Sequence, residues 1–314
     1  MYNQDKTGQE NYHTNNTNNN NNTNNTNNKN NNNKKNNKNI KNKIIYLYGR
    51  PNETCVRKAQ NLISKKKSNK QTRNVSPKET KKIFQEFIKE YNIKDWEIHI
   101  NKKSVANASV NPGEKQIIIK SRNFSFKEIN TLICHEIETH VFRSANGYLQ
   151  KYEILGSIGT PDYLKTEEGI ATVMEELNGN FNPTRFRFFC AREIASFLAQ
   201  TKSFHEIFKI LHQQYNLSLN NSYLITKRVK RGLDDTSRPG GFIKDHVYFE
   251  GREMIMNYIK NGRPLNVLFA GKFGIRDLPL LKKELKKPVY LPRVLQNPLL
   301  QTILYNKEEN KRRK

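Results

Sequence analysis

Residues 134–140 read Cys-His-Glu-Ile-Glu-Thr-His and place two imidazoles and two carboxylates on one short stretch of chain. A capping box precedes this stretch, because Glu128 follows Ser125 by three residues. Apolar residues then recur at helical spacing from Ile129 to Val141. In an H-E-x-x-H helix both histidines bind zinc and the glutamate activates water. The segment therefore predicts a helix that carries a candidate metal site.

The two histidines stand one residue further apart than in H-E-x-x-H. Residues four apart are separated by about 40° around an ideal α-helix, whereas residues five apart diverge by about 140°. A regular helix therefore cannot direct both His135 and His140 at one ion. We expect a π-type bulge within Ile137–Thr139, because one extra residue in the turn realigns the two rings. The alternative is that both histidines are ordinary helix residues, with Glu136 and Glu138 in solvent.

A third metal ligand can come from residues 166–170, which read Thr-Glu-Glu-Gly-Ile. We expect the threonine to cap a second helix that ends at 178–179, where Asn-Gly favours a C-cap. Glu167 and Glu168 would then lie in the first turn of that helix. One of them can complete a metal site, or both can simply compensate the helix macrodipole. Gly169 is expected to let another helix pack closely.

The rest of the sequence predicts an α+β fold that is mostly helical and contains a small β-sheet. Alternating apolar and polar residues indicate strands at 96–100 and 116–120. Capping residues and apolar periodicity indicate further helices at 76–91, 184–200 and 204–215. No internal repeat or strong linker interrupts the chain between 42 and 306, which favours one domain over residues 44–306.

The two ends of the sequence differ in composition from the middle. Asn accounts for 19 of the 30 residues between 11 and 40, which predicts a disordered tail over residues 1–43. The charged run 307–314 is expected to form a second, basic tail. The 314 residues carry 55 Lys and Arg against 29 Asp and Glu, a net charge of +26. Residues 1–43 contribute only +5, from seven Lys against Asp5 and Glu10, so the domain itself is basic.

Composition excludes several classes of protein. Mean hydropathy is -0.88 and no apolar run is long enough for a transmembrane helix. The polar N-terminus does not fit a signal peptide, and Cys55, Cys134 and Cys190 fit neither a disulfide framework nor a zinc knuckle. We therefore expect a cytoplasmic protein. The positive charge favours an acidic partner, so a nucleic-acid-binding protein without catalysis stays the second hypothesis, although no nucleic-acid-binding motif is visible.

Several segments together resemble the microtubule-associated tyrosine carboxypeptidase family and its bacterial relatives. The family motifs are H-E-I-G-T-H, R-x-x-N-G-x-x-Q-P and T-E-E-G-L-A, in this order. The corresponding residues here are His135–His140, then Arg143, Asn146-Gly147 and Gln150, and finally Thr166–Ala171. Segments 228–232 and 240–248 also resemble the family, so the similarity extends from about Ser76 to Leu285.

The resemblance implies a mostly helical, zincin-like metallopeptidase domain that depends on Zn²⁺. It implies that His135, His140 and Glu168 bind zinc, that Glu136 is the general base, and that Glu167 supports the site. Characterised animal members remove the C-terminal tyrosine of α-tubulin. The expected activity is therefore a zinc carboxypeptidase that removes a C-terminal Tyr or Phe from a protein or peptide, with the acidic tubulin tail as one candidate. A zinc peptidase of this family with another substrate is the alternative.

Two residues depart from the family pattern. Glu138 stands where the family usually has Gly, and Lys151 stands where Pro is expected after Gln150. Glu138 would point to solvent or change the field at the metal site. Without the proline, the segment Tyr148–Pro161 is expected to be less constrained.

Substrate binding needs further groups. Tyr248 and His246 are candidate donors to the oxyanion, although Tyr248 could instead be a buried structural residue. Arg143, Arg231 and Lys244 are candidates for binding the C-terminal carboxylate of the substrate, and Arg143 could instead be a structural clamp. Arg228 and Lys230 are expected on a solvated basic face.

Overall fold

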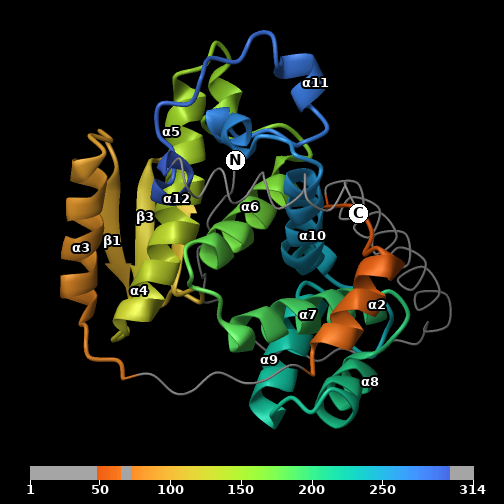
Figure 1. The fold of residues 1–314 in the computed structure, drawn as a ribbon. Coiled ribbons are helices and arrows are strands. Elements are labelled where there is room, and N and C mark those ends of the chain that lie inside the picture. Colours follow the sequence, from red (N-terminus) through yellow and green to blue (C-terminus); the bar gives the residue numbers. More distant parts are fainter. Residues whose placement is uncertain (1–47, 65–71, 298–314) are drawn as a thin grey trace, which may run out of the picture. The chain divides into compact units, whose positions relative to one another are not determined.

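The computed structural model describes residues 48–64 and 72–297. The tails expected at 1–43 and 307–314 lie outside the described residues. The described part is mostly helical with one small sheet, which confirms the predicted α+β class (Figure 1). The α-helices are α2 Glu53–Leu62, α3 Pro77–Glu90, α4 Phe126–Leu132, α5 Phe142–Tyr148, α6 Tyr163–Leu177, α7 Pro183–Leu198, α8 Phe204–Lys209, α9 Leu219–Lys230, α10 Val247–Lys260, α11 Leu278–Leu281 and α12 Arg293–Gln296. The π-helices are η1 Ile133–Val141 and η3 Ile210–Gln214, and the 3₁₀ helices are η2 Glu153–Leu155, η4 Ile243–His246 and η5 Leu265–Ala270.

The sheet has three strands in the order β1-β3-β2, with bounds Glu97–Asn101 for β1, Gln116–Lys120 for β3 and Ala108–Asn111 for β2. β1 runs parallel to β3 and β2 runs antiparallel to it. The two predicted strands are thus confirmed. β2 was not predicted, because it has only four residues and its Ala and Asn do not favour strands, although apolar and polar residues alternate in it.

The capping boxes predicted at Ser76 and Ser125 are confirmed. Ser76 and Ser125 both form complete capping boxes, and each side chain accepts a hydrogen bond from the backbone three residues on. The predicted helix 184–200 is α7, and the predicted helix 204–215 is α8 followed by η3. These signals are local, so they do not depend on the tertiary structure.

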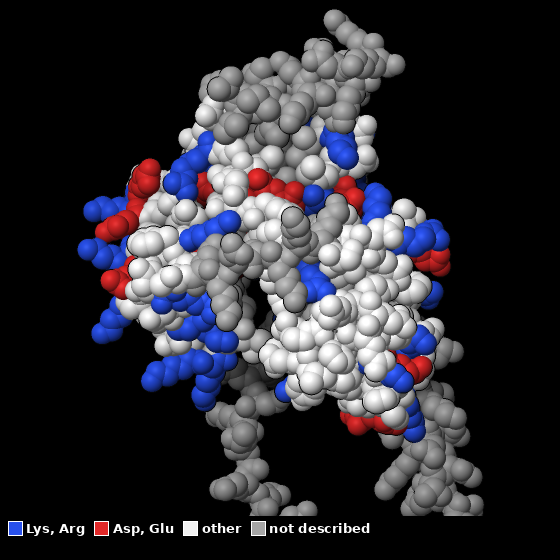
Figure 2. Space-filling model, turned by 60° about the horizontal axis from the view of Figure 1, so that its bottom comes forward, with Lys and Arg blue, Asp and Glu red and all other residues white. Residues whose placement is uncertain are grey.

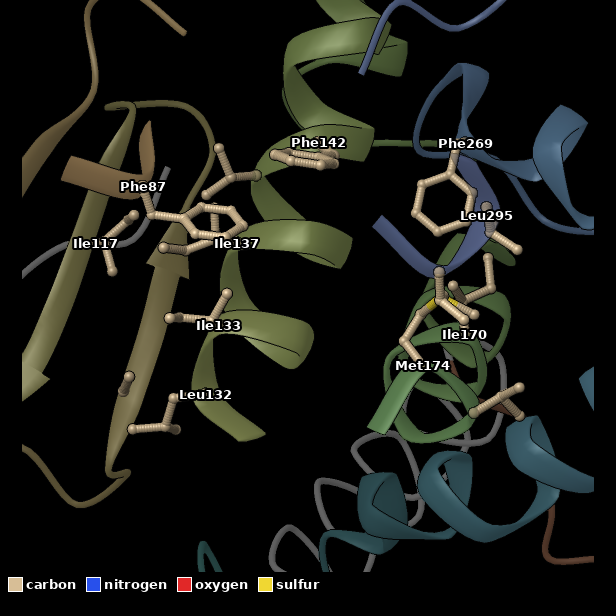
Figure 3. Packing of buried hydrophobic residues seen from close by; sticks show 14 of the residues in the cluster. Phe87, Ile117, Leu132, Ile133, Ile137, Phe142, Ile170, Met174, Phe269 and Leu295 are labelled. Carbon is tan, nitrogen blue, oxygen red and sulfur yellow. The ribbon is translucent and has the colours of Figure 1, made fainter. Parts of the chain in front are cut away.

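The π-helix η1 lies between the sheet and α6. Figure 3 shows Ile133 and Ile137 on the sheet side of η1, near Ile117 of β3, whereas Ile170 and Met174 of α6 lie on the other side. All five side chains are buried in one hydrophobic core. A second core joins α2, α7, α8, α9 and α10. The face of η1 opposite the sheet is therefore directed toward α6.

Helices α6 and α10 cross at two glycines. A Cβ atom built on Gly169 would lie 2.4 Å from the carbonyl carbon of Gly251, and one built on Gly251 would lie 2.2 Å from the carbonyl oxygen of Lys165. Both contacts are with backbone, which cannot move aside. The close packing expected at Gly169 is confirmed, and it fixes the residue that follows Glu168 against α10.

We expect Gly169→Ala to lower the free energy of unfolding by about 3 kcal/mol or more, because the added methyl group forces the two helices apart. Urea denaturation of the full chain measures this change. Gly113→Ala is the control, because the nearest atom to its Cβ, an oxygen of Asn111, is 3.9 Å away. Equal stability of the two variants would contradict the close crossing.

The predicted start of α6 is wrong. The expected N-cap was Thr166, but the N-cap is Asp162 and the helix begins at Tyr163. The hydroxyl of Thr166 instead accepts a hydrogen bond from the backbone N–H of Ile275 at 2.9 Å. Glu167 and Glu168 therefore lie in the second turn, beyond the position at which acidic residues best compensate the macrodipole. The predicted end at Asn178-Gly179 is confirmed.

The expectation that Arg228 and Lys230 lie on a solvated basic face is also wrong. Lys230 is 1% exposed and donates to the carbonyl oxygens of Lys202 at 2.5 Å and Arg238 at 2.7 Å. Arg228 forms an ion pair with the buried Asp245. Burial lowers the pKa of Lys230 to about 8.

Among residues 48–64 and 72–297, no helix has both the length and the apolar character needed to cross a membrane.

Candidate metal centre

The helix that carries the two histidines has π geometry over Ile133–Val141. The hydroxyl of Thr139 donates to the carbonyl oxygen of Cys134, five residues earlier, at 2.9 Å. The predicted bulge is therefore confirmed, and it extends over a longer segment than expected. The rings of His135 and His140 lie 5.1 Å apart, inclined at 74°. The wider turn thus brings both imidazoles to the same side, as a shared ion requires.

The two imidazoles converge on Glu168. Its Oε2 lies 3.5 Å from Nε2 of His135 and 3.9 Å from Nε2 of His140. His135 and Glu168 are buried, and His140 is half-buried. Within the described part of the chain this Oε2 has no hydrogen-bond partner. Two nitrogens and one buried carboxylate oxygen at these separations fit three ligands that each lie about 2.0–2.2 Å from one zinc ion.

Glu175 orients the first imidazole. Its Oε1 lies 2.7 Å from Nδ1 of His135, and Arg185 of α7 holds the same oxygen at 2.9 Å. A carboxylate on Nδ1 keeps a proton there and leaves Nε2, which faces Glu168, as the nitrogen that a metal can bind in place of a proton, the arrangement common to metal-binding histidines. Burial lowers the pKa of His135, but the carboxylates of Glu168 and Glu175 raise it to about 10. The site therefore favours positive charge.

Glu167 orients the second imidazole. Its Oε1 lies 2.8 Å from Nδ1 of His140 and accepts from Nζ of Lys272 at 2.5 Å, while its Oε2 accepts from Arg143 at 2.8 Å. Burial raises the pKa of this carboxyl, but the two cations and His140 lower it well below its ordinary value. Adjacent glutamates of α6 thus have different surroundings: Glu168 faces the histidines directly, and Glu167 supports one of them from behind.

The sequence left open whether Arg143 binds the substrate or clamps the structure, and its contacts are those of a structural clamp. Its side chain has no exposed surface. Besides Glu167, it donates to the carbonyl oxygens of Leu268 and Phe273, each at 2.9 Å. These contacts tie η5 and the segment after it to the metal centre. The geometry does not support the expectation that Arg143 binds the substrate.

Glu136 and Tyr248 both lie near the centre. Glu136 is 7% exposed, and its charge acts on His135 and Arg185. The ring of Tyr248 stacks on Phe189 at a centroid distance of 5.4 Å. Burial first, and then the charge of Glu168, raise the pKa of Tyr248 above its ordinary value. The phenol is therefore close enough to the metal centre to sense its carboxylate.

The remaining candidates lie in different places. Burial raises the pKa of Glu168, but the two histidines, and to a smaller extent the charge of Lys244, lower it to about 2. The Nζ of Lys244 lies 5.8 Å from the ring centroid of Tyr48. Arg231 is exposed and stacks on Phe242 at 4.0 Å. His246 lies outside the centre, where its Nε2 is 2.8 Å from the carbonyl oxygen of Tyr48.

Glu138 and Lys151, the two residues that depart from the family pattern, both interact with charged side chains of the described chain. Glu138 is fully buried, so it does not point to solvent, and its Oε1 accepts from the backbone N–H and Nε of Arg293 at 3.0 and 3.1 Å. It therefore anchors α12 to the π-helix. Lys151 is exposed, and its Nζ forms an ion pair with Glu284 at 3.1 Å. Tyr152 donates to the same carboxylate at 2.7 Å, which restrains the segment that lacks proline.

Sequence reasoning missed three residues that support the site. Glu175 follows Glu168 by seven residues, which is two helical turns, so its position on the same face of α6 was a usable signal. Arg185 and Lys272 come from segments with no local motif. Only the tertiary structure brings their charges to Glu175 and Glu167.

The described chain is thus a mostly helical α+β protein in which two histidines and one glutamate form a group that could hold a metal ion. Residues 35–308 match the family described as microtubule-associated tyrosine carboxypeptidase, and the chain belongs to this family.

Three relatives match about half of the chain. The protein named "Putative tyrosine carboxypeptidase MATCAP2" is 33% identical over 159 residues in Mus musculus and 31% identical over 156 residues in Homo sapiens. "Microtubule-associated tyrosine carboxypeptidase 1" of Rattus norvegicus is 32% identical over 155 residues. Each alignment covers 48% of this chain, and 29%, 29% and 32% of the respective relative. The chain thus matches less than a third of each relative's length.

Proposed function

We propose that the chain is a zinc-dependent carboxypeptidase that removes a C-terminal Tyr or Phe from a protein or peptide. The observation that carries this proposal is the convergence of Nε2 of His135 and Nε2 of His140 on the unsatisfied Oε2 of Glu168. The names of the family and of the relatives support the carboxypeptidase class. His135, His140 and Glu168 would hold the metal.

When bound, zinc would supply Lewis-acid chemistry, polarising the scissile carbonyl and lowering the pKa of water toward about 7. Glu136 directly follows the first histidine and acts as the general base, taking a proton from the attacking water and returning it to the leaving amine. Tyr248 donates a hydrogen bond to the developing oxyanion. A tyrosine phenol is protonated at neutral pH, and burial raises the pKa of Tyr248 further, so its hydroxyl can donate.

Recognition of a C-terminal carboxylate needs a cation beside the centre, and Arg143 does not supply it. Lys244 remains a candidate because its charge acts on Glu168. Arg192 of α7 is a further candidate: its guanidinium lies 5.6 Å from the ring centroid of Tyr248. Its Nε has no hydrogen-bond partner among the described residues, and its closest carboxylate oxygen, in Asp245, is 3.9 Å away. We propose that Arg192 and Lys244 together bind the terminal carboxylate.

An acidic protein tail suits the surface of the chain. Figure 2 shows Lys and Arg side chains gathered on the side that carries α3 and the sheet. Such a surface attracts a polyanionic segment and accelerates its encounter with the protein. The family name points to microtubules, so we propose the tail of α-tubulin, in the cytoplasm, as the first substrate to test.

The test uses the zinc-loaded full chain and synthetic peptides that differ only in their last residue. We expect release of a C-terminal Tyr or Phe, detected by mass spectrometry, with little release of Glu. A peptide with an amidated C-terminal Tyr is the matched control and should stay intact. If no peptide is trimmed, or if the amidated peptide is trimmed equally, the carboxypeptidase assignment fails. Equal trimming of an acidic tubulin-like tail and a neutral tail would favour another substrate.

A further inference from the structure

A second cluster of metal-ligating side chains lies outside the centre described above. Glu193 of α7, His246 of η4 and Glu250 of α10 each offer one ligand atom, and these atoms lie within 4.8 Å of one another. Glu193 and His246 have no exposed surface, and Glu250 is 6% exposed. Figure 1 shows α7 and α10 beside α2, which contacts both of them. The cluster is therefore enclosed where three helices meet.

The hydrogen bonds of His246 assign its tautomer. Its Nε2 lies 2.8 Å from the carbonyl oxygen of Tyr48, and a carbonyl oxygen only accepts, so Nε2 carries a proton. In a neutral imidazole, Nδ1 is then an acceptor. This nitrogen faces Oε2 of Glu250 at 3.2 Å. Two acceptors at this separation repel each other unless a proton or another cation lies between them.

Glu193 has the least favourable surroundings of the three. Neither of its carboxylate oxygens has a hydrogen-bond partner among residues 48–64 and 72–297. A buried and unpaired carboxylate costs several kcal/mol, so such a group binds a proton or a cation. Burial, and then the charge of Glu250, raise the pKa of Glu193 to about 9. The structure thus holds a buried ligand that no cation contacts among the described residues, although the charge of Lys165 acts on it from a distance.

Glu250, in contrast, is well held. Its Oε2 accepts from Nζ of Lys165 at 2.7 Å, and its Oε1 accepts from the backbone N–H of Asn52 at 2.5 Å. Lys165 balances one of the two carboxylates, so one negative charge remains when Glu193 is ionised. Burial, and then the charges of Glu250 and Glu193, raise the pKa of the Cys55 thiol in α2 to about 12.

We propose that Glu193, His246 and Glu250 bind a second divalent metal ion in a closed site with a structural role, and we take zinc as the ion to test because imidazole and carboxylate both bind it. Imidazole nitrogens and carboxylate oxygens both bind zinc, and the burial of all three side chains keeps bulk solvent away from the site. The ion would join α7 to α10. It would also hold the segment around Asn52, because the backbone N–H of Asn52 donates a hydrogen bond to Glu250. This inference does not depend on the proposed activity.

The experiment separates the two sites by removing the first. The full chain with His135→Ala, or with Glu168→Gln as a second background, is loaded with zinc, freed of loosely bound metal by gel filtration and analysed for metal by mass spectrometry. Circular dichroism confirms that each variant is folded. We expect one zinc per chain in these backgrounds and none when Glu193→Gln is added. Glu253→Gln is the matched control and should retain the ion. Glu253 also lies on α10, but its side chain is partly exposed and forms an ion pair with Lys58.

Thermal unfolding gives a second readout. Zinc should raise the Tm of the His135→Ala chain and should leave the Tm of the chain with His135→Ala and Glu193→Gln unchanged, because a ligand stabilises only a fold that binds it. A folded His135→Ala chain that holds no zinc and shows no zinc-dependent Tm would overturn the proposal. The cluster would then be neutralised by a proton on Glu193. Loss of peptidase activity alone would bear only on the first site.

Discussion

Replacing Glu136 by Gln is expected to lower kcat on a peptide ending in Tyr by about 100- to 10,000-fold, the usual contribution of a general base. The amide has nearly the same shape as the carboxylate but cannot accept the proton of the attacking water. Zinc content should stay unchanged, because Glu136 is not one of the three converging ligands. Steady-state kinetics together with metal analysis of the same preparation measure both effects.

Glu138→Gln is the matched control for this prediction. Both glutamates lie on the π-helix, but the carboxylate of Glu138 accepts hydrogen bonds from Arg293. We expect kcat to change only a few-fold in this variant, while the free energy of unfolding falls by about 1–3 kcal/mol because a charged hydrogen bond in the interior is weakened. If Glu136→Gln retained full turnover, another group would be the base.

Glu167→Gln should have the largest effect on stability. The change removes the carboxylate that forms ion pairs with both buried cations, Arg143 and Lys272, and we expect the free energy of unfolding to fall by about 3–5 kcal/mol at neutral pH. It also removes the carboxylate from Nδ1 of His140, which should weaken zinc binding by about 10- to 100-fold. Urea denaturation and a competitive zinc chelator measure the two effects.

The loss of stability caused by Glu167→Gln should depend on pH. Burial raises the pKa of Glu167, but Lys272 and Arg143 hold it well below its ordinary value of 4.5 in the folded chain. Its contribution to stability is therefore complete above pH 4.5 and decreases as the pH falls below that value. The parent and variant should converge in stability in acid. Glu284→Gln, at an exposed carboxylate, is the control and should change stability by less than about 1 kcal/mol.

The sequence was sufficient for features set by neighbouring residues. The capping boxes at Ser76 and Ser125 depend on contacts three residues apart. The π-helix followed from the five-residue step between His135 and His140, because only an altered turn aligns the two rings. The choice of Glu168 over Glu167 came from family resemblance alone, and the structure places Glu168 with the histidines.

Features set by distant contacts could not be predicted in the same way. Thr166 does not cap α6, and its hydroxyl instead accepts a hydrogen bond from the backbone of Ile275, more than one hundred residues away. Lys230 is buried, and two carbonyl oxygens outside its helix accept hydrogen bonds from its ammonium group. Arg143 has the right charge for a substrate contact, but three partners from η5, α6 and the segment after η5 enclose it. Charge and spacing in a sequence do not reveal which cations the fold encloses.

The most direct test of the central claim is a crystal structure of the zinc-loaded full chain, with anomalous diffraction recorded at the zinc absorption edge. The account predicts an anomalous peak about 2.0–2.2 Å from Nε2 of His135, Nε2 of His140 and a carboxylate oxygen of Glu168. A crystal in which these three side chains enclose no anomalous peak, or in which the two imidazoles point apart, would contradict it.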